Sequence, residues 1–430
     1  MQKISLVVIA LIMTLTVSAQ NPKDCKAGQL ATLIEDCNIT SLELKGHMDA
    51  RDFRFIADSL RQLTHLDLGA ITIDAYRGET LFGNVNEYAA GEVPCQALAS
   101  MLELQTLVLP QGATRLGDGC MAGCPKLATV QFPAGLKRIG DYALSGCIKL
   151  TGATATTTLA HIGDGAFSNC TALQSFVIGE PADTDSTRAA ALSLNIGARA
   201  FANCPALRTV DLGNLVKTMG SEVLAETGLQ QLDLSSHSQL DTLPDWALTN
   251  TALRQLTLPA NVRVIGDGAL MNDDNISQLT LPATVGYIGS HAMAYMNGLK
   301  QLESKPTDVP ALGDSVWYGI DQSTVVLKVS PQSLADYRAA PQWCNFAMAS
   351  FRRGDVNADG VVDIADVNIV INIMLGRDSA DNYDGRAYIT ENDTNVDIAD
   401  VNAVINLMLA RLRAMRLAAA RAAAQAATSH

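Results

Sequence analysis

The stretch "IGDGAFSNCTAL", Ile162 to Leu173, decides the fold of this 430-residue chain because the chain repeats it. One close copy is "IGDYALSGCIKL" at Ile139. All seven other copies begin at Leu116, Ile139, Ile196, Met219, Leu243, Ile265 and Ile288. Successive copies start 23 residues apart, except for one gap of 34 and one pair of 24 and 22. A period of this length indicates a solenoid, in which each unit buries its apolar side against its neighbours.

Most copies are flanked by a short strand-like piece such as "LRQLTLP", which begins at Leu253. Apolar residues alternate in these pieces, as a strand with one buried face requires. The outward positions form a polar stripe with few charges and no aromatic residue. A peptide or a glycan could hydrogen-bond to such a stripe, and a solvated sheet face with no ligand is the alternative. The candidate ligand-binding residues on it are Gln231, Gln255, Gln278 and Gln301.

These repeats resemble leucine-rich repeats of the BspA-like type, whose pattern is close to "L-x-x-L-x-L-P … I-G-x-x-A-F-x-x-C-x-x-L". The resemblance implies an α/β-type leucine-rich repeat solenoid, with short strands and helical turns, over residues 104–305. It also implies an N-terminal cap with the first coils at 20–103 and a C-terminal cap at 306–353. Family members, many of them from Bacteroidetes, are mostly secreted or cell-surface proteins implicated in adhesion and in host or interbacterial contact. The resemblance thus implies an unidentified host, bacterial or glycan ligand for this chain.

Two columns of equivalent residues follow from the repeat. The cysteines at one position predict a column of buried free thiols, because cysteine is among the most buried residue types; they are Cys124, Cys147, Cys170 and Cys204. The aspartates after the first glycine predict caps on short helical turns rather than a calcium ladder; they are Asp118, Asp141, Asp164 and Asp267. Nearer the N-terminus, Cys25 and Cys37 form either a disulfide or two free thiols, which the sequence leaves open.

The first residues predict export. Lys3 is followed by an apolar run from Ile4 to Val17, and small residues precede Gln20. This is the pattern of a secretory signal peptide at residues 1–19, and the apolar run is too short for a membrane anchor. No later stretch is apolar and long enough to span a membrane. We therefore expect a secreted, extracellular or surface-associated protein with no transmembrane segment in the mature chain.

The acidic charge is concentrated near the C-terminus. The whole chain has a net charge of −13. Residues 354–410 contain eleven Asp and Glu against two Arg, which gives −9, and residues 411–430 add four Arg. This distribution argues against a nucleic-acid partner and favours a cation bound in the acidic block.

The acidic block begins with a loop of calcium-binding spacing. Oxygen ligands stand at loop positions 1, 3, 5, 9 and 12, a backbone carbonyl at position 7, and Gly360 at the sharp turn. The predicted calcium ligands are Asp355, Asn357, Asp359, Val361, Asp363 and Asp366. Position 12 is Asp rather than the Glu of the general motif. No helix is predicted before the loop, but "DVNIVINIML" after it has the periodicity of an amphipathic helix.

A near-duplicate follows 34 residues later, in "VDIADVNAVINLML". Two such half EF-hands resemble a type I dockerin, a small all-α module, over residues 354–410. The resemblance implies calcium binding and docking onto a cohesin-like domain of another protein. It assigns partner contacts to loop positions 10 and 11, which are Ile364, Ala365, Ile398 and Ala399. Because the two pairs are identical, either helix could be presented to the partner after a half-turn rotation.

The second loop keeps fewer ligands than the first. A shift of 34 residues places Ile389 at position 1 and Thr394 at position 6, so one carboxylate and the turn glycine are lost. We therefore predict a weak or empty second site. Its remaining ligands are Glu391, Asp393, Asn395, Asp397 and Asp400.

No catalytic pattern accompanies these modules. The chain has no GxSxG, HExxH or Cys/His signature, and its six histidines share no motif. We therefore predict a non-catalytic binding and adhesion protein carried on a docking module. The alternatives are a spacer that only docks, and a component of a polysaccharide-degrading assembly. The tail at 411–430 predicts a longer last helix, for which a membrane-surface role and a solvated extension both stay open.

Overall fold

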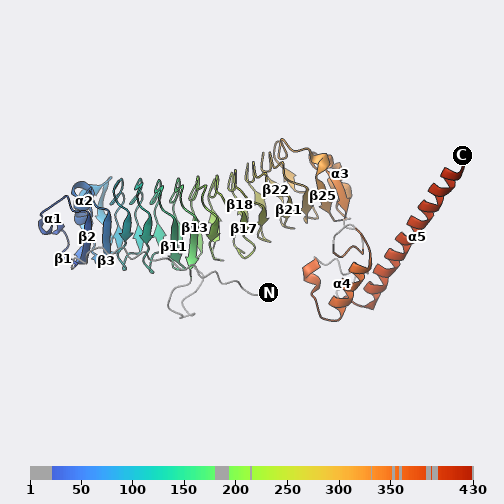
Figure 1. Ribbon diagram of the computed structural model, residues 1–430, viewed down its shortest axis with the longest axis horizontal. Coiled ribbons are helices and arrows are strands. Elements are labelled where there is room, and N and C mark those ends of the chain that lie inside the picture. Colours follow the sequence, from blue (N-terminus) through green and yellow to red (C-terminus); the bar gives the residue numbers. More distant parts are fainter. Residues whose placement is uncertain are drawn as a thin grey trace. The chain divides into compact units, whose positions relative to one another are not determined.

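The computed structural model describes residues 22–179, 193–213, 216–330, 332–350, 354–357, 361–383, 389 and 396–428. These residues fall into two compact units. The first unit runs to Leu232 and includes His237–Leu240 and Pro244–Ala252; the second holds Asp233–Ser236, Asp241–Leu243 and everything from Leu253 onward. Each unit contains stacked coils of parallel strands (Figure 1). The predicted signal peptide at 1–19 lies outside the described residues.

The first unit arranges its strands in parallel sheets, with successive coils in neighbouring places. One sheet has the order β1-β2-β3-β7-β9, from Lys23–Cys25, Ser41–Met48, His65–Ile73, Thr106–Val108 and Thr129–Gln131. A second has the order β16-β14-β12-β10-β8-β6, from Val216–Met219, Leu194–Ile196, His161–Ile162, Arg138–Ile139, Arg115–Leu116 and Glu92–Val93. A third has the order β11-β13-β15, from Gly152–Thr156, Ser175–Gly179 and Thr209–Asp211. A hairpin of β4 (Tyr76–Phe82) and β5 (Val85–Tyr88) is antiparallel.

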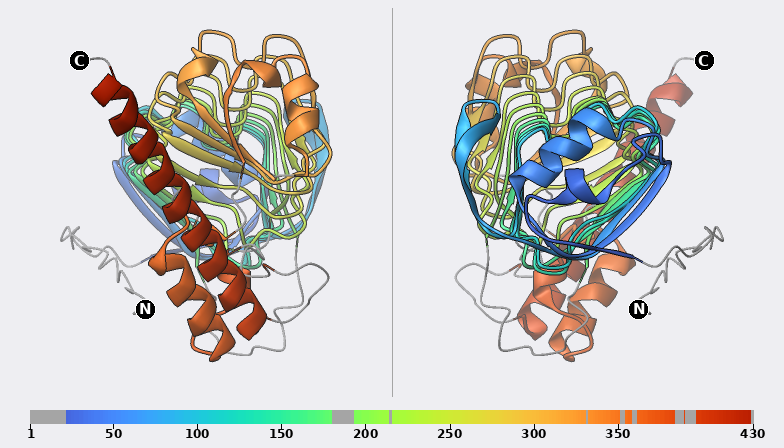
Figure 2. Two further views of the ribbon diagram at one scale, coloured as in Figure 1. Left: turned by 90° about the vertical axis from the view of Figure 1, so that its right-hand side faces the viewer. Right: turned by 90° about the vertical axis from the view of Figure 1, so that its left-hand side faces the viewer.

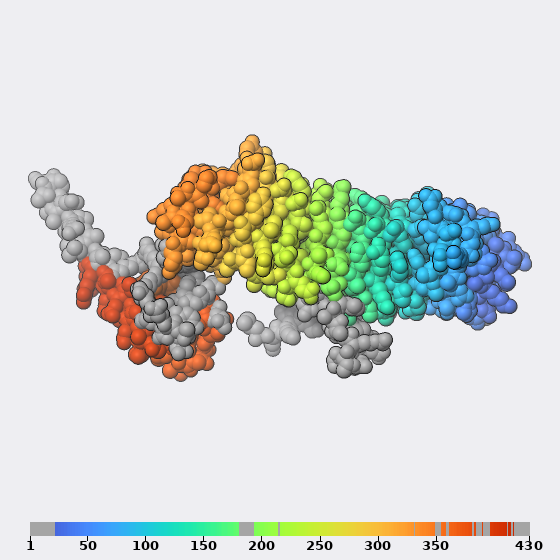
Figure 3. Space-filling model, turned by 180° about the vertical axis from the view of Figure 1, so that it is seen from behind, coloured from blue at the N-terminus to red at the C-terminus, as the bar shows by residue number. Residues whose placement is uncertain are grey.

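The strand register reproduces the sequence period. Ile139 pairs with Leu116 on one side and with Ile162 on the other, so that one copy makes one coil. All three side chains are buried, because alternate residues of each strand point into the coil. Leucines, cysteines and phenylalanines of successive copies then form one core along the stack. In the space-filling view, neighbouring coils within a unit lie against one another without gaps between the colour bands (Figure 3).

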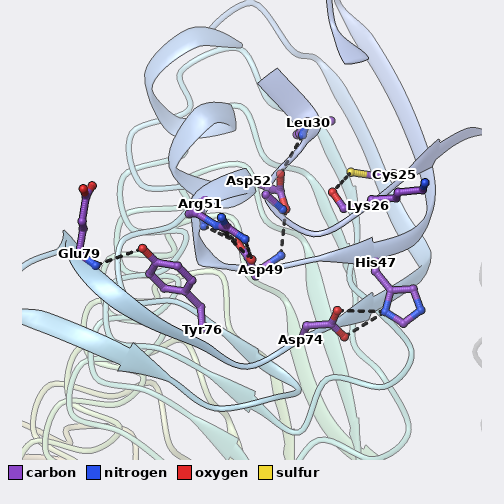
Figure 4. Close-up of polar contacts among 11 residues, drawn as sticks. Cys25, Lys26, Leu30, His47, Asp49, Arg51, Asp52, Asp74, Tyr76 and Glu79 are labelled. Atoms are coloured by element: carbon purple, nitrogen blue, oxygen red, sulfur yellow. Dashed lines mark hydrogen bonds and ion pairs between the residues drawn. The ribbon is translucent and has the colours of Figure 1, made fainter. Parts of the chain in front are cut away.

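Two helices close the N-terminal end of the first unit. Helix α1 covers Leu30–Leu33, and α2 (Ala50–Ser59) lies across the end of the first coils (Figure 2). The buried carboxylate of Asp52 accepts hydrogen bonds from the backbone N–H groups of Gly28, Leu30 and Asp49 at 2.7, 2.9 and 2.9 Å. Figure 4 shows how Asp52 joins the start of α1 to the start of α2. A buried carboxylate with this many donors is satisfied and holds the cap in place.

The turns between strands are not helical, so the prediction of helical turns is wrong. Among the described residues, no helix occurs between Leu60 and Asp321. Two positions in each copy instead have a left-handed backbone, for example Tyr142 and Asn169 with φ of 55° and 60°. Alternate N–H groups of these turns bond to the next coil, as Tyr142 does to the carbonyl of Asp164 at 2.7 Å, and those between them make i to i−3 bonds within the turn, as Ser145 does to Tyr142 at 3.1 Å. Bonding between coils therefore replaces the i to i−4 bonds of a helix.

The aspartates of the repeat also form hydrogen bonds between neighbouring coils. Asp118 Oδ1 accepts a hydrogen bond from the N–H of Asp141 at 2.9 Å, and Asp141 Oδ1 accepts one from Asp164 at 3.0 Å. They do cap N–H groups, as predicted, but those of the following coil. The glycine before each aspartate makes room, because a Cβ on Gly140 would lie 2.5 Å from Asp118 Oδ1. The "IGD" motif is therefore a signature of the contact between coils.

The cysteine column is buried as predicted. Cys124, Cys147, Cys170 and Cys204 are free thiols with no exposed surface. Burial raises the pKa of Cys147 and Cys204 to about 12 and that of Cys124 to about 11. Cys25 is buried and Cys37 is exposed, and both are free, which settles the alternative against a disulfide between them.

We expect the first unit to lose stability at alkaline pH because of this column. A thiol whose pKa is raised in the folded state stabilises the fold fully below its unfolded pKa and loses that contribution as the pH rises towards the folded value. Between about pH 7 and about pH 10 the loss should be on the order of 2 kcal/mol per buried thiol. Urea unfolding at both pH values measures it. Cys147→Ala should reduce the pH-dependent loss, whereas Cys37→Ser should leave it unchanged; equal losses in both variants would contradict the assignment.

The second unit continues with coils of the same type. One sheet has the order β18-β20-β22-β24, from Thr242–Leu243, Val264–Ile265, Tyr287–Ile288 and Ala311–Leu312. Another has the order β21-β23-β25-β26, from Gln278–Leu281, Gln301–Ser304, Val326–Val329 and Ala347–Ser350. Strand β19 covers Gln255–Thr257, and β17 (Gln231–Asp233) falls on the boundary between the units.

Aromatic side chains close the last coils. Trp343 and Tyr337 are buried, and their ring centroids lie 5.1 Å apart. Trp343 Nε1 donates to the carbonyl of Pro310 at 3.1 Å, and the Tyr337 hydroxyl lies 2.7 Å from Ser304 Oγ. These residues come from η2 (Trp343–Asn345) and α3 (Leu334–Ala339), which follow η1 (Gln322–Thr324). The aromatic cluster covers apolar surface that the final coil would otherwise expose.

The second unit also contains a helical module. It consists of α4 (Ile364–Met374), the short η3 (Ala380–Tyr383) and α5 (Ile398–Thr428). The module has its own apolar core, which includes Val356, Val362, Val367, Val370, Ala380, Ile389, Val401 and Val404. Helices α4 and α5 pack against each other in it. The Ala/Arg-rich tail prolongs the last helix, as predicted, because α5 continues without a break to Thr428.

Candidate functional site

The glutamine stripe lies on the outer face of the strands. Gln278 and Gln301 are paired residues of β21 and β23. Gln255 on β19 is exposed, as is Gln231, which belongs to the first unit. Beside the stripe, Thr280 Oγ1 donates to Glu303 Oε2 at 3.3 Å. The second unit therefore presents a row of amides next to a row of hydroxyl and carboxylate groups, and its use for a ligand stays a prediction.

A hollow of about 170 Å³ lies in the first unit, beside β6 and β8. Its lining includes Cys95, Asp118, Arg115 and Arg138. Burial, followed by the charge of Asp118, raises the pKa of Cys95. A nucleophilic cysteine needs the opposite shift, because the thiolate is the reactive form. Cys95 is therefore a poor nucleophile, and the absence of catalysis in the whole chain stays a prediction.

The first acidic loop folds so that its last residue, Asp366 at position 12, contacts the residues that begin the loop. Asp366 is fully buried, and its Oδ1 accepts hydrogen bonds from the N–H groups of Val356 and Asn357 at 2.7 and 3.1 Å. Its Oδ2 accepts one from Asp363 at 2.9 Å. Asp355 is also buried, with 4% of its surface exposed. The backbone N–H groups at positions 2, 3 and 9 of the loop thus bond to the side chain at position 12, and Asp359 lies outside the described residues.

These groups have the right chemistry for calcium. Calcium takes six to eight oxygen ligands, and the side chains of this loop offer carboxylate and amide oxygens. Among the described residues, no three acidic, histidine or cysteine side chains already converge on one point. Both oxygens of the Asp366 carboxylate accept hydrogen bonds from backbone N–H groups. An ion would have to bind to a lone pair that these bonds leave unused. The donor set fits calcium, and calcium binding stays a prediction.

The second loop repeats the arrangement around its last position. Asp400 is fully buried, and its Oδ1 accepts a hydrogen bond from the N–H of Ile389 at 2.7 Å. Its Oδ2 accepts one from Asp397 at 3.0 Å. The predicted ligands Glu391, Asp393 and Asn395 lie outside the described residues. Ile389, which replaces the first carboxylate, is buried in the apolar core and offers no side-chain ligand.

The predicted contact residues stand at the exposed start of each helix. Ile364 and Ile398 are both 60% exposed. Ala365 and Ala399, next to them, are exposed as well. Each alanine N–H donates to the aspartate two residues before it, at 2.7 Å to Asp363 and 2.6 Å to Asp397. The two helix starts therefore present the same pair of apolar side chains in the same local geometry.

Sequence reasoning missed the capping role of the last loop position. Asp363 and Asp366 form a capping box at the start of α4, in which each side chain accepts from the backbone at the other residue. The spacing of two acidic or hydroxyl residues three apart, just before an apolar helix, is the known sequence signal for this box. "DIAD" at residues 363–366 and 397–400 contains that signal.

Among the described residues, no helix is long and apolar enough to cross a bilayer.

Comparison with known protein families gives one match. A family described as "BspA type Leucine rich repeat region" matches six copies over residues 92–191 and 187–300. These residues contain the copies from Leu116 to Ile288 and nearly all of the predicted solenoid at 104–305. No curated protein matches the chain.

Several solved structures resemble the chain at low identity. A leucine-rich repeat protein from Bacteroides ovatus is 16% identical, with 63% of this chain and 90% of that chain covered and a TM-score of 0.27. The pneumococcal vaccine antigen PcpA is 17% identical, with 63% and 86% covered and a TM-score of 0.31. A leucine rich cell surface protein from Faecalibacterium prausnitzii is 15% identical, with 66% and 89% covered and a TM-score of 0.26.

Proposed function

We propose that this chain, whose residues 92–300 are BspA-type leucine-rich repeats, is a secreted, non-catalytic binding and adhesion protein that docks onto a partner through its C-terminal module. The repeats recognise a ligand, and residues 354–410 form a calcium-ordered, dockerin-like module. The partner of that module is a cohesin-like domain of another protein. The protein acts outside the cell or at its surface.

The observation that carries the docking proposal is the duplication of an exposed apolar pair. Isoleucines with 60% of their surface exposed are unusual on a small module, and here two of them occupy equivalent places on α4 and α5. Single exposed apolar side chains are common on any protein, but the same pair repeated at equivalent places fits an interaction surface. The buried Asp366 and Asp400 fix both helix starts, so each pair is presented rigidly. The module needs no catalytic group for this role.

Calcium supports the same surface. The first loop holds the carboxylates of Asp355, Asp363 and Asp366 within twelve residues of sequence, and a divalent cation would offset their mutual repulsion. Asp355, Asn357, Asp359, Val361, Asp363 and Asp366 would hold the ion. The ion would hold the loop in the conformation that starts α4. Ile364 and Ala365 are the first two residues of that helix.

The experiment that tests docking uses the full chain and a panel of purified type I cohesin modules. Ile364→Asp and Ile398→Asp should each leave binding within about threefold of the parent, because the other helix start can be presented instead. The double variant should lose at least about a hundredfold in affinity, since buried apolar anchors dominate interfaces. Binding is measured by calorimetry with calcium present.

Leu375→Asp with Leu409→Asp is the matched control. Both leucines are exposed, on or next to the same two helices but away from the helix starts. This control should bind cohesin as the parent does, and circular dichroism should show equal helix content in all variants. If no cohesin binds the parent chain, or if the double isoleucine variant still binds, the docking proposal fails.

A further inference from the structure

Three exposed aromatic rings gather on the turns of the second unit. Tyr295 and Tyr318 are 38% and 56% exposed, and their rings meet edge to face with centroids 5.4 Å apart and planes at 85°. The exposed ring of His291 lies 6.3 Å from that of Tyr318. We call these three residues the aromatic corner. They lie on the turns that follow β22 and β24, and not on the strands that carry the glutamine stripe.

The fold holds one of these rings in a fixed place. The N–H of Tyr295 donates to the carbonyl of Tyr318 at 2.7 Å, which ties the two turns together. The ring of Tyr295 lies against Gly319, where a Cβ would come within 2.6 Å of Tyr295 Cδ1. The glycine of the next coil therefore makes the space that the ring occupies. A ring fixed in this way loses little side-chain freedom when it binds a ligand.

Folding alone does not account for a tyrosine at this position. Tyr295 has a left-handed backbone with φ of 58°, which Gly and Asn adopt more readily than an aromatic residue. Six of the seven other copies use those residues at the same place and one has Glu226; the six are Gly123, Gly146, Asn169, Asn203, Asn250 and Asn272. An exposed aromatic residue in an unfavourable backbone conformation points to a function.

The surroundings of the aromatic corner are polar. Asn272 holds the same turn position one coil earlier, and its N–H donates to the carbonyl of Ala294. Asn297 donates from its backbone N–H and its side chain to Asp274 Oδ1, both at 3.0 Å. Asp314 and Ser315 beside Tyr318 are exposed. The turns that carry the two tyrosine rings and their neighbours thus also carry amide, carboxylate, hydroxyl and imidazole groups.

We propose that the aromatic corner binds a glycan, with a pyranose ring stacked on a tyrosine. A pyranose has a face of C–H groups, which packs on an aromatic ring, and a rim of hydroxyls, which need hydrogen-bond partners. A protein partner with an apolar surface would leave the polar groups near the aromatic corner without hydrogen-bond partners. This inference rests on the proposed binding role and names its ligand class, but it does not depend on the docking module.

The test uses the full chain and a set of soluble polysaccharides: a mixed-linkage β-glucan, a galactomannan, an arabinoxylan and a pectic galactan. Affinity electrophoresis finds the binders, and calorimetry with oligosaccharides of the same types measures affinity. Tyr295→Asn removes the ring but keeps a residue that the turn accepts in other copies. Tyr295→Asn and Tyr318→Ala should each weaken binding by about tenfold or more.

Tyr287→Ala is the matched control. Tyr287 is 41% exposed on β22 and, among the described residues, makes no ring contact. Its replacement should leave affinity unchanged. Glycan binding that survives both corner variants would place the ligand elsewhere and overturn this site, without affecting the binding role. If no polysaccharide binds the parent chain, the glycan assignment is wrong, and cohesin docking is judged separately by the isoleucine variants.

Discussion

Replacing Phe167 with Ala is expected to lower the free energy of unfolding of the first unit by about 3–5 kcal/mol. Phe167 is fully buried at the meeting point of three rings. Its ring stacks on that of Phe201 with centroids 5.2 Å apart and planes at 4°, and it meets Phe176 at 5.3 Å. Removing it leaves a cavity between two adjacent coils, which rigid stacking cannot close. Urea unfolding followed by circular dichroism measures the change.

Phe167→Leu is the control for this change. Leu144, Leu224 and Leu270 hold the equivalent place in other copies, so leucine suits the turn. Its cost should not exceed about 1.5 kcal/mol, because most of the volume is kept. A repeat protein can unfold in stages, so the change should appear in the transition of the first unit and not in that of the helical module. Equal stabilities of the alanine variant and the parent would show that Phe167 is not a core residue.

The coil architecture was predictable because the length of the sequence repeat determines which residues of successive copies meet. A residue at a given place in one copy must meet its equivalents in the next, so Ile139 had to pair with Leu116 and Ile162. The burial of the cysteine column follows from the same rule. No single copy carries this information, since one coil cannot bury its own apolar side.

The turns were predicted wrongly for a physical reason. An aspartate followed by small residues, as in "GDGAF", resembles a helix start, where the side chain caps the following N–H groups. In the stack, the N–H groups of Asp141 and Tyr142 find acceptors on the neighbouring coils instead. Tertiary hydrogen bonds thus decide the backbone conformation against the local preference, and one isolated copy cannot reveal them.

The candidate sites likewise include features that the sequence predicts and features that only the folded structure reveals. The loop ligands were predicted from spacing, because one short segment supplies them all, and Ile364 was predicted from the resemblance to a dockerin. The burial of Asp366 and its bonds to Val356 and Asn357 follow from how the loop closes on the helix, which spacing alone does not give. The aromatic corner was missed because its rings come from two coils, and the repeat pattern assigns those positions to small residues in most copies.

Removing calcium is expected to unfold the helical module and leave the repeats folded. The first loop contains four carboxylates within twelve residues, and like charges this close in the sequence repel one another when no cation is bound. A module of this size has a small core and little reserve of stability. We therefore expect the chelator EDTA to lower the helical circular dichroism signal and to abolish cohesin binding. The β signal of the coils should not change, because none of their described contacts uses the loop.

The variants Asp366→Ala and Asp355→Ala together should abolish docking even with calcium present. Alanine at 366 removes the acceptor of two N–H groups, those of the buried Val356 and the half-buried Asn357. Each buried donor left unsatisfied costs about 1–3 kcal/mol. The start of α4, which carries Ile364, would then lose its anchor. Calorimetry with a cohesin module measures the loss.

Asp366→Asn and Asp400→Asn separate the ion from the hydrogen bonds. The two aspartates are equally buried and make similar bonds, so the substitutions disturb the helix starts to a similar extent. Only Asp366 belongs to the loop with a full ligand set. Asp366→Asn should therefore weaken calcium binding by at least about tenfold, whereas Asp400→Asn should leave the tight site unchanged. Equal losses in both variants would assign the ion to the pair of loops together, and an unchanged affinity in Asp366→Asn would remove the ion from the first loop.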